Sequence, residues 1–141
     1  MEGLDKAYGD IVRLVLNSRG LVPQASAQLR SLFGTDRELQ LELDRFQEDM
    51  RSGFRGYRNP PGNQRTFVDH IVAASSECIF ARVLRDYSAV SQVLAVETEW
   101  VALSRLDISR DPTGFNTTGW AYTYHGFPPP GFPDPPNQCH V

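Results

Sequence analysis

The chain has 141 residues, a formal net charge of −3 and 22% charged residues. This length suits one domain, which buries roughly two-thirds of its unfolded-chain surface and needs no metal or disulfide to hold a core. The mild negative charge offers no basic footprint for nucleic acid. No apolar run approaches the ~18 residues that cross a membrane, so we expect no transmembrane segment in this chain.

The first twenty residues carry apolar side chains at helical spacing. Leu4, Ile11 and Val15 belong to one stripe of this pattern, which predicts an amphipathic helix over residues 4–16. Gly20 follows, and we expect it to take the left-handed conformation that closes the helix.

Two further helices are predicted from their end signals. Pro23 suits the first turn of a second helix, which ends at Gly34. Thr35 and Glu38 form a Thr-x-x-Glu capping box that begins a third helix. The apolar side of this helix consists of Leu39, Leu43, Phe46 and Met50. The other side is charged, and we interpret it as a solvated face made of Glu42, Asp44, Arg45, Glu48 and Asp49.

The sequence of the second half of the chain predicts β-strands. Residues 51–65 are rich in Gly and Pro and separate the two halves. Four β-branched or aromatic segments follow, at 67–74, 77–87, 98–109 and 118–125. Periodicity alone leaves the first of these open as a strand or a short helix. Asp111 to Gly114 form a turn, and the short links predict an antiparallel meander.

This order of elements predicts an α+β fold, with three N-terminal helices packed on one face of a sheet of about four antiparallel strands. We place a single domain at 1–126 and a tail at 127–141. The tail holds six of the ten prolines, so it is neither helix nor central strand and is expected to run extended over the surface, or to be disordered until it is tied down.

The two cysteines are Cys78, in a strand-like run, and Cys139, close to the end of the tail. Neither lies in a cluster with metal-ligand spacing, so we expect no metal site and no cofactor. They are either two free thiols or one disulfide. A bridge closing about 60 residues would stabilise the domain by roughly 4 kcal/mol and would indicate an oxidising compartment. A cysteine near the end of an untethered tail favours the bridge.

An aromatic group on the last two predicted strands is formed by Trp100, Trp120, Tyr122 and Tyr124. The last three share one face if the strand is regular. They either fill the core, which is the usual role of aromatics at this spacing, or line a concave ligand pocket. Asp86 and Tyr87, near the end of an adjacent strand, would contribute to such a pocket.

Other candidate sites have simpler interpretations. Asp69 and His70 are sequence neighbours, so in a strand they point to opposite faces and read as a surface pair. The arginines of the 51–65 link read as part of a solvated loop. No nucleophile motif, phosphate-binding loop or metal set is present in the sequence.

The β half resembles the nuclear-transport-factor-2-like superfamily, and within it the small secreted proteins and lipoproteins of actinobacteria. The strings that carry the resemblance are CIFARVLRDYSAV at 78–90, EWVALSRL at 99–106, NTTGWAYTYHGF at 116–127 and the terminal Cys139. The resemblance covers about half of the chain. It implies a curved, cone-like sheet, an exported and often membrane-tethered domain, and a disulfide between Cys78 and Cys139. None of the strings is a catalytic signature, so no catalytic residue is carried over.

Taken together, these features predict a secreted or cell-envelope-associated, non-catalytic binding or interaction domain with a small apolar ligand pocket. The export signal or anchor would lie outside the given residues, because residues 1–10 lack the basic and apolar regions of a signal peptide. The expected partners are an envelope protein, a small apolar ligand or a second copy through the sheet face. The alternative is a cofactor-free isomerase or hydrolase that uses an acid or His inside the cone. A cavity holding such a group against aromatic hydroxyls would favour this alternative.

Overall fold

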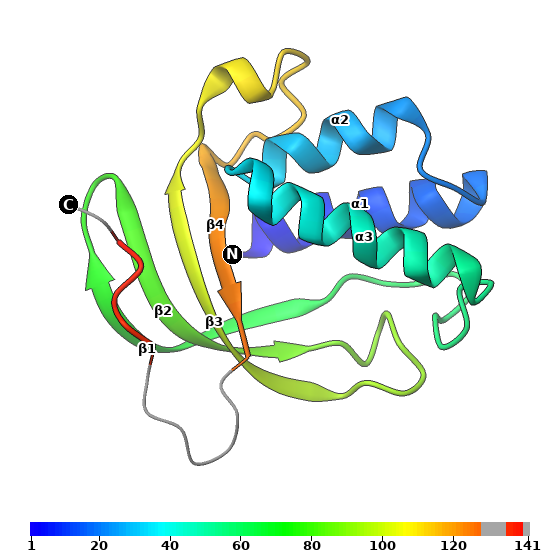
Figure 1. Ribbon diagram of the computed structural model, residues 1–141. Coiled ribbons are helices and arrows are strands. Elements are labelled where there is room, and N and C mark those ends of the chain that lie inside the picture. The colour runs from blue at the N-terminus through cyan, green and yellow to red at the C-terminus, as the bar shows by residue number, and fades with distance from the viewer. Residues whose placement is uncertain (128–134, 140–141) are drawn as a thin grey trace.

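Three helices come first in the chain and four strands follow (Figure 1). The computed structural model describes residues 1–127 and 135–139. The helices are α1 (Glu2–Ser18), α2 (Pro23–Leu32) and α3 (Asp36–Arg51), and the strands are β1 (Arg65–Ala74), β2 (Cys78–Asp86), β3 (Val96–Arg105) and β4 (Trp120–Gly126), with a short 3₁₀ helix η1 (Ile108–Arg110). The α+β class is confirmed, and the segment whose type was open is strand β1.

The helix ends follow the local sequence closely. The Thr35 hydroxyl accepts a hydrogen bond from the Glu38 amide at 3.1 Å, so the Thr35 half of the predicted capping box forms at the start of α3. Helix α1 closes differently from the prediction, because the left-handed residue is Arg19, with φ of 53°, and not Gly20. The amides of Arg19 and Gly20 bond back to Leu16 and Val15, so the closing turn falls one residue earlier.

The sheet is an antiparallel meander in the order β1-β2-β3-β4. Its strands curve around the layer of helices, which lies on one side only (Figure 1). The register shifts between β3 and β4, because Ala102 pairs with Tyr124 while Leu103 pairs with Tyr122. Thr123 is therefore an extra residue in β4, and such a bulge reverses the faces beyond it.

This bulge corrects one prediction. Tyr122 joins the core between sheet and helices, whereas Tyr124 packs on the opposite face with Phe80 and Trp100. The expected common face of Trp120, Tyr122 and Tyr124 is therefore wrong, since a period of two holds only along a regular strand.

The two faces of the sheet bury different clusters. The inner face packs against the helices through residues such as Val83 and Val101, which meet Ile11, Leu29 and Phe46. The outer face carries the smaller cluster of Phe80, Trp100 and Ala102. Cys139 packs on this outer cluster, so the described end of the tail lies against the side of the sheet away from the helices.

The tail is attached covalently, because Cys78 and Cys139 form a disulfide across a separation of 61 residues, as predicted. The predicted path of the rest of the tail, residues 128–134 and 140–141, lies outside the described residues. In the part of the chain that is described, no helix has both the length and the apolar character needed to cross a bilayer.

Replacing both Cys78 and Cys139 with Ser is expected to lower the free energy of unfolding by about 4 kcal/mol, because the unfolded chain regains the entropy of an open loop. Urea unfolding of the variant, and of the wild type with and without reductant, measures the loss. The reduced wild type should match the variant, and the variant should not respond to reductant. Equal stability of the oxidised and reduced wild type would contradict this role of the bridge.

Candidate functional site

A cavity of about 750 Å³ lies between the helices and the inner face of the sheet. Helices α1 and α3 contribute to it from one side, strands β2, β3 and β4 from the other, and the loops at 55–57 and 90–94 complete its lining. Its apolar lining consists of Val12, Phe33, Leu41, Val90, Val93, Leu94, Tyr122 and Phe127. This volume is in the range of small-molecule sites in proteins.

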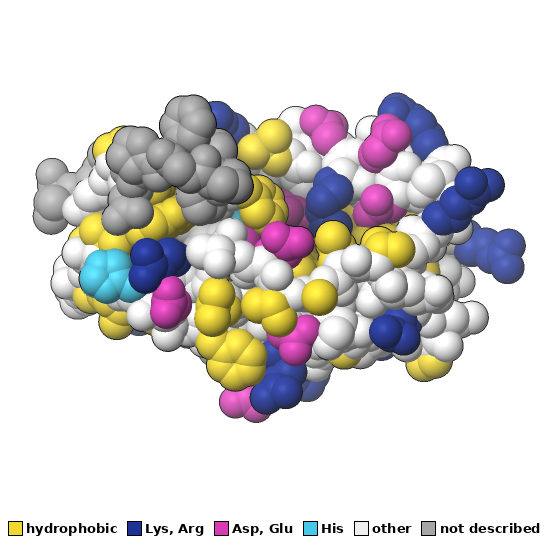
Figure 2. All heavy atoms as spheres, turned by 90° about the horizontal axis from the view of Figure 1, so that it is seen from below, with side chains coloured by type: hydrophobic (Ala, Val, Ile, Leu, Met, Phe, Trp, Pro, Cys, Tyr) yellow, Lys and Arg dark blue, Asp and Glu magenta, His cyan; other side chains and the backbone are white. Residues whose placement is uncertain are grey.

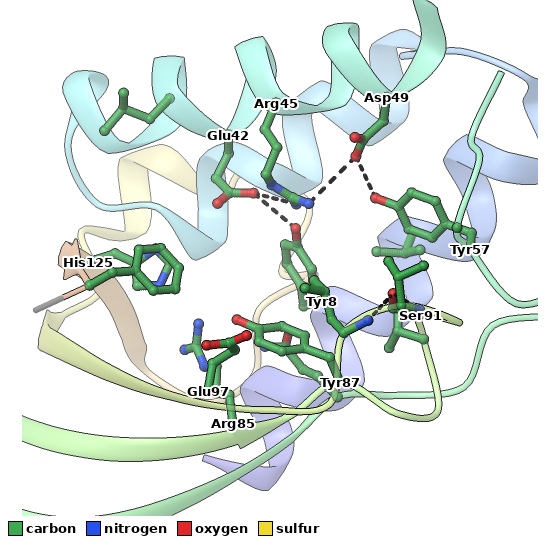
Figure 3. A pocket seen from close by; sticks show the side chains of 18 of the residues that line it. Tyr8, Glu42, Arg45, Asp49, Tyr57, Arg85, Tyr87, Ser91, Glu97 and His125 are labelled. Atoms are coloured by element: carbon green, nitrogen blue, oxygen red, sulfur yellow. Dashed lines mark hydrogen bonds and ion pairs between the residues drawn. The ribbon is translucent and has the colours of Figure 1, made fainter. Parts of the chain in front are cut away.

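Helix α3 places three charged side chains over the cavity (Figure 3). Glu42 accepts hydrogen bonds from the Tyr8 hydroxyl and from Arg45 Nη2, both at 2.9 Å. Asp49 accepts from the Tyr57 hydroxyl at 2.6 Å and lies 3.6 Å from Arg45 Nη1. Spacings of three and four residues bring these groups to one side of the helix.

The base of the cavity is organised by Glu99, whose side chain is 0% exposed. It accepts hydrogen bonds from Arg85 Nη1 at 3.3 Å, from the Tyr87 hydroxyl and from His125 Nε2. Burial alone would raise the pKa of Glu99, but the His125 hydrogen bond and the Arg85 charge outweigh it and hold that pKa below its usual value. Glu99 is therefore an ionised carboxylate that fixes its neighbours.

The same network reaches helix α1. Arg85 Nε donates to the Thr66 hydroxyl at 3.2 Å, and that hydroxyl donates to Asp5 at 2.7 Å. The Thr66 amide also donates to Asp5, at 2.8 Å. Hydrogen bonds thus run from α1 through β1 and β2 to Glu99 on β3, which orients the Arg85 guanidinium at the base.

Glu42 has the opposite electrostatic character. Its side chain is only 13% exposed, and burial raises its pKa to about 7, with the charges of Glu38 and Asp49 adding to the effect. His125 and Arg85 face it and lower the value in part. A carboxyl group that titrates near neutral pH can both take up and release a proton.

Two polar atoms at the base find no hydrogen-bond partner among the described residues. They are Arg85 Nη2 and the Tyr122 hydroxyl, and both are buried. The Arg85 guanidinium carbon lies 5.0 Å from the centre of the Tyr122 ring, so the two groups are neighbours. Buried hydrogen-bonding groups are satisfied in most proteins, so this pair calls for an explanation.

Two of the six predicted pocket residues line the cavity, and the other four do not. Tyr122 and Tyr87 line the cavity, at its base. Trp120 instead lines a smaller apolar pocket of about 340 Å³ near the start of α1. Trp100 and Tyr124 pack on the outer face of the sheet. The Asp86 carboxylate accepts from the Ser88 amide at 2.9 Å and does not line the cavity.

The residues that dominate the cavity chemistry were not among those predicted. Glu42, Arg45 and Asp49 were assigned to a solvated helix face, and Arg85, Glu99 and His125 were not singled out. Glu99 carried a usable signal, because it alternates with Val101 and Leu103 and so shares their inward face. The role of Glu42 depends on Tyr8, 34 residues away, so no local pattern marks it.

The other sequence candidates lie away from the cavity. Asp69 pairs with Arg82 at 2.7 Å on the surface, and the neighbouring His70 is exposed. In the 51–65 link, Arg51 pairs with Glu48, while Arg55 lies at the edge of the cavity. Within the described residues no group of three or more His, Cys, Asp or Glu is placed to hold a metal ion.

Comparisons with protein-family models, with curated proteins and with solved structures find no match to this chain. The cavity therefore has to be interpreted from its own geometry.

Glu42→Gln is expected to change how stability depends on pH. An acid whose pKa is higher when folded binds more protons in the folded state, so its contribution to stability falls as pH rises from the unfolded to the folded value. The pKa of an ordinary Glu is near 4.5 and that of Glu42 is about 7. Between these two pH values, the free energy of unfolding of the wild type should fall by about 3 kcal/mol relative to that of the variant.

Urea unfolding at several pH values measures this difference. Glu97→Gln is the matched control, because Glu97 is an exposed carboxylate that lines the same cavity. It should leave the pH dependence of the wild type in place. A wild-type minus Glu42→Gln difference that is flat with pH would show that Glu42 is not buried as described.

Proposed function

We propose that the protein is a binding domain that holds a small, largely apolar ligand without covalent chemistry. The observation that carries this proposal is the cavity of about 750 Å³. Its lining joins apolar side chains with a few oriented polar groups, which is the usual composition of ligand sites. The charged groups that α3 and the cavity base contribute are already paired within the protein, and such groups orient a ligand more readily than they react with it.

We also propose that the chain is an exported member of the nuclear-transport-factor-2-like superfamily. The order of three helices and a curved antiparallel sheet supports this assignment, and so does the disulfide, since disulfides persist in oxidising compartments. An envelope protein or a second copy remains a proposed partner. Cys139 already covers part of the outer sheet face around Phe80, which reduces the area open to a second copy there.

The binding proposal is tested with the neutral fluorescent dye N-phenyl-1-naphthylamine. Its emission should rise in a saturable, single-site manner, because the apolar lining excludes water from the ring. Leu94→Asp should weaken dye binding at least several-fold, since Leu94 lines the cavity and the new carboxylate would have to lose hydration beside the bound ring.

Ile108→Asp serves as the matched control, because Ile108 is exposed in η1 and does not line the cavity. This variant should bind the dye as the wild type does. Binding that never saturates, or an equal loss in both variants, would count against the cavity as the binding site.

A second candidate is a cofactor-free isomerase or hydrolase, and Glu42 is the observation that favours it. Its carboxylate borders open space, contacts the Tyr8 hydroxyl at 2.9 Å and has a pKa of about 7. A base of this kind removes a proton from the carbon next to a carbonyl, or from a water that opens an epoxide. An acid that contacts an aromatic hydroxyl inside the cavity is the feature expected for this alternative.

The enzyme candidate predicts deuterium incorporation into 2-cyclohexen-1-one in D₂O, or hydrolysis of styrene oxide, both followed by NMR. Glu42→Gln should slow the reaction by about 10²-fold or more, because general-base catalysis contributes factors of this size. Glu97→Gln should not slow it. If the protein converts neither compound faster than buffer does, the enzyme candidate is rejected and only the binding function stands.

A further inference from the structure

The unpaired atoms at the base of the cavity specify one end of the ligand. Arg85 Nη2 and the Tyr122 hydroxyl have no partner within the described part of the chain, although both side chains line the cavity. A guanidinium only donates hydrogen bonds, so its partner has to be an acceptor. The two groups are neighbours, so an acceptor oxygen that reached both would accept a hydrogen bond from each.

The surroundings of these groups disfavour a negative charge on that oxygen. The Arg85 charge is already offset by Glu99, at 3.3 Å, and the Arg45 charge by Glu42, at 2.9 Å. His125 is hydrogen-bonded to Glu99 as well. An incoming carboxylate beside Arg85 would therefore find that counter-charge already engaged by Glu99.

Other parts of the cavity lining are apolar and exposed. Val93 is 79% exposed, and Leu94 and Leu41 are about half exposed, yet all three line the cavity. Figure 2 shows hydrophobic side chains at the surface among charged ones on the lower face of the molecule. A ligand with its oxygen at the base would leave an apolar remainder for these apolar parts of the lining.

We propose that the cavity selects neutral, largely apolar molecules with one hydrogen-bond-accepting oxygen, such as a ketone, and holds that oxygen between Arg85 and Tyr122. This inference rests on the proposed binding function and adds the chemical class and the orientation of the ligand. The buried donors that the free protein leaves unpaired are then satisfied in the complex.

The test compares 2-octanone with octanoate, which has the same number of carbon atoms and carries a negative charge. Each displaces N-phenyl-1-naphthylamine from the wild type, from Tyr122→Phe and from Tyr124→Phe. 2-Octanone should bind the wild type at least tenfold more tightly than octanoate, because the carboxylate would be buried without a free counter-charge.

Tyr122→Phe should weaken 2-octanone binding by about three- to tenfold, the usual worth of one neutral hydrogen bond. The dye lacks an acceptor oxygen, so loss of the hydroxyl should change its affinity less than that of 2-octanone. Tyr124→Phe removes the same hydroxyl from the other face of β4 and should behave as the wild type. Tyr122→Phe should also unfold at higher urea concentration than the wild type, since it removes a buried hydroxyl with no partner.

The failures are distinguishable. If the dye binds but octanoate equals 2-octanone, or Tyr122→Phe leaves ketone binding unchanged, the oxygen is not held at this base and only this inference falls. If neither the dye nor the ketone binds saturably, the proposed binding function falls with it.

Discussion

The fully buried carboxylate of Glu99 fixes the side chains at the base of the cavity. A charge that is fully buried is stable only when it is paired and hydrogen-bonded, so Arg85, Tyr87 and His125 have to point toward it. These side chains form a charged base beneath α3, which presents charged groups of its own in Figure 3. Two charged surfaces that face each other do not close into a dry contact, because each would lose its hydration. The space between them is therefore retained as a cavity.

Much of the architecture could be predicted from the sequence because its signals are local. The spacing of apolar residues, the Thr35 cap and the Asp111 turn mark elements that the structure contains. The faces of β4 could not be predicted in the same way. The extra residue at Thr123 changes which side Tyr124 occupies, and nothing in the local alternation signals that shift.

The candidate site was harder to predict, and the reason is physical. A charged helix face looks the same in sequence whether water or a cavity lies against it, so the sequence predicts a solvated Glu42. Its partner Tyr8 comes from another helix. In the strands, a polar residue at an inward position such as Glu99 is the exception to the apolar pattern. Such exceptions are expected where a protein gives up packing for function.

The most direct test of this account is to map ligand contacts on the ¹⁵N-labelled protein by NMR while 2-octanone is added. If the ligand binds in this cavity, the amide signals of Tyr87, Leu94 and Tyr122 shift, and those of Phe80 and Trp100 on the outer face do not. Shifts gathered instead at Val68 and Ile71, beside the smaller pocket, or no saturable shifts at all, would contradict it.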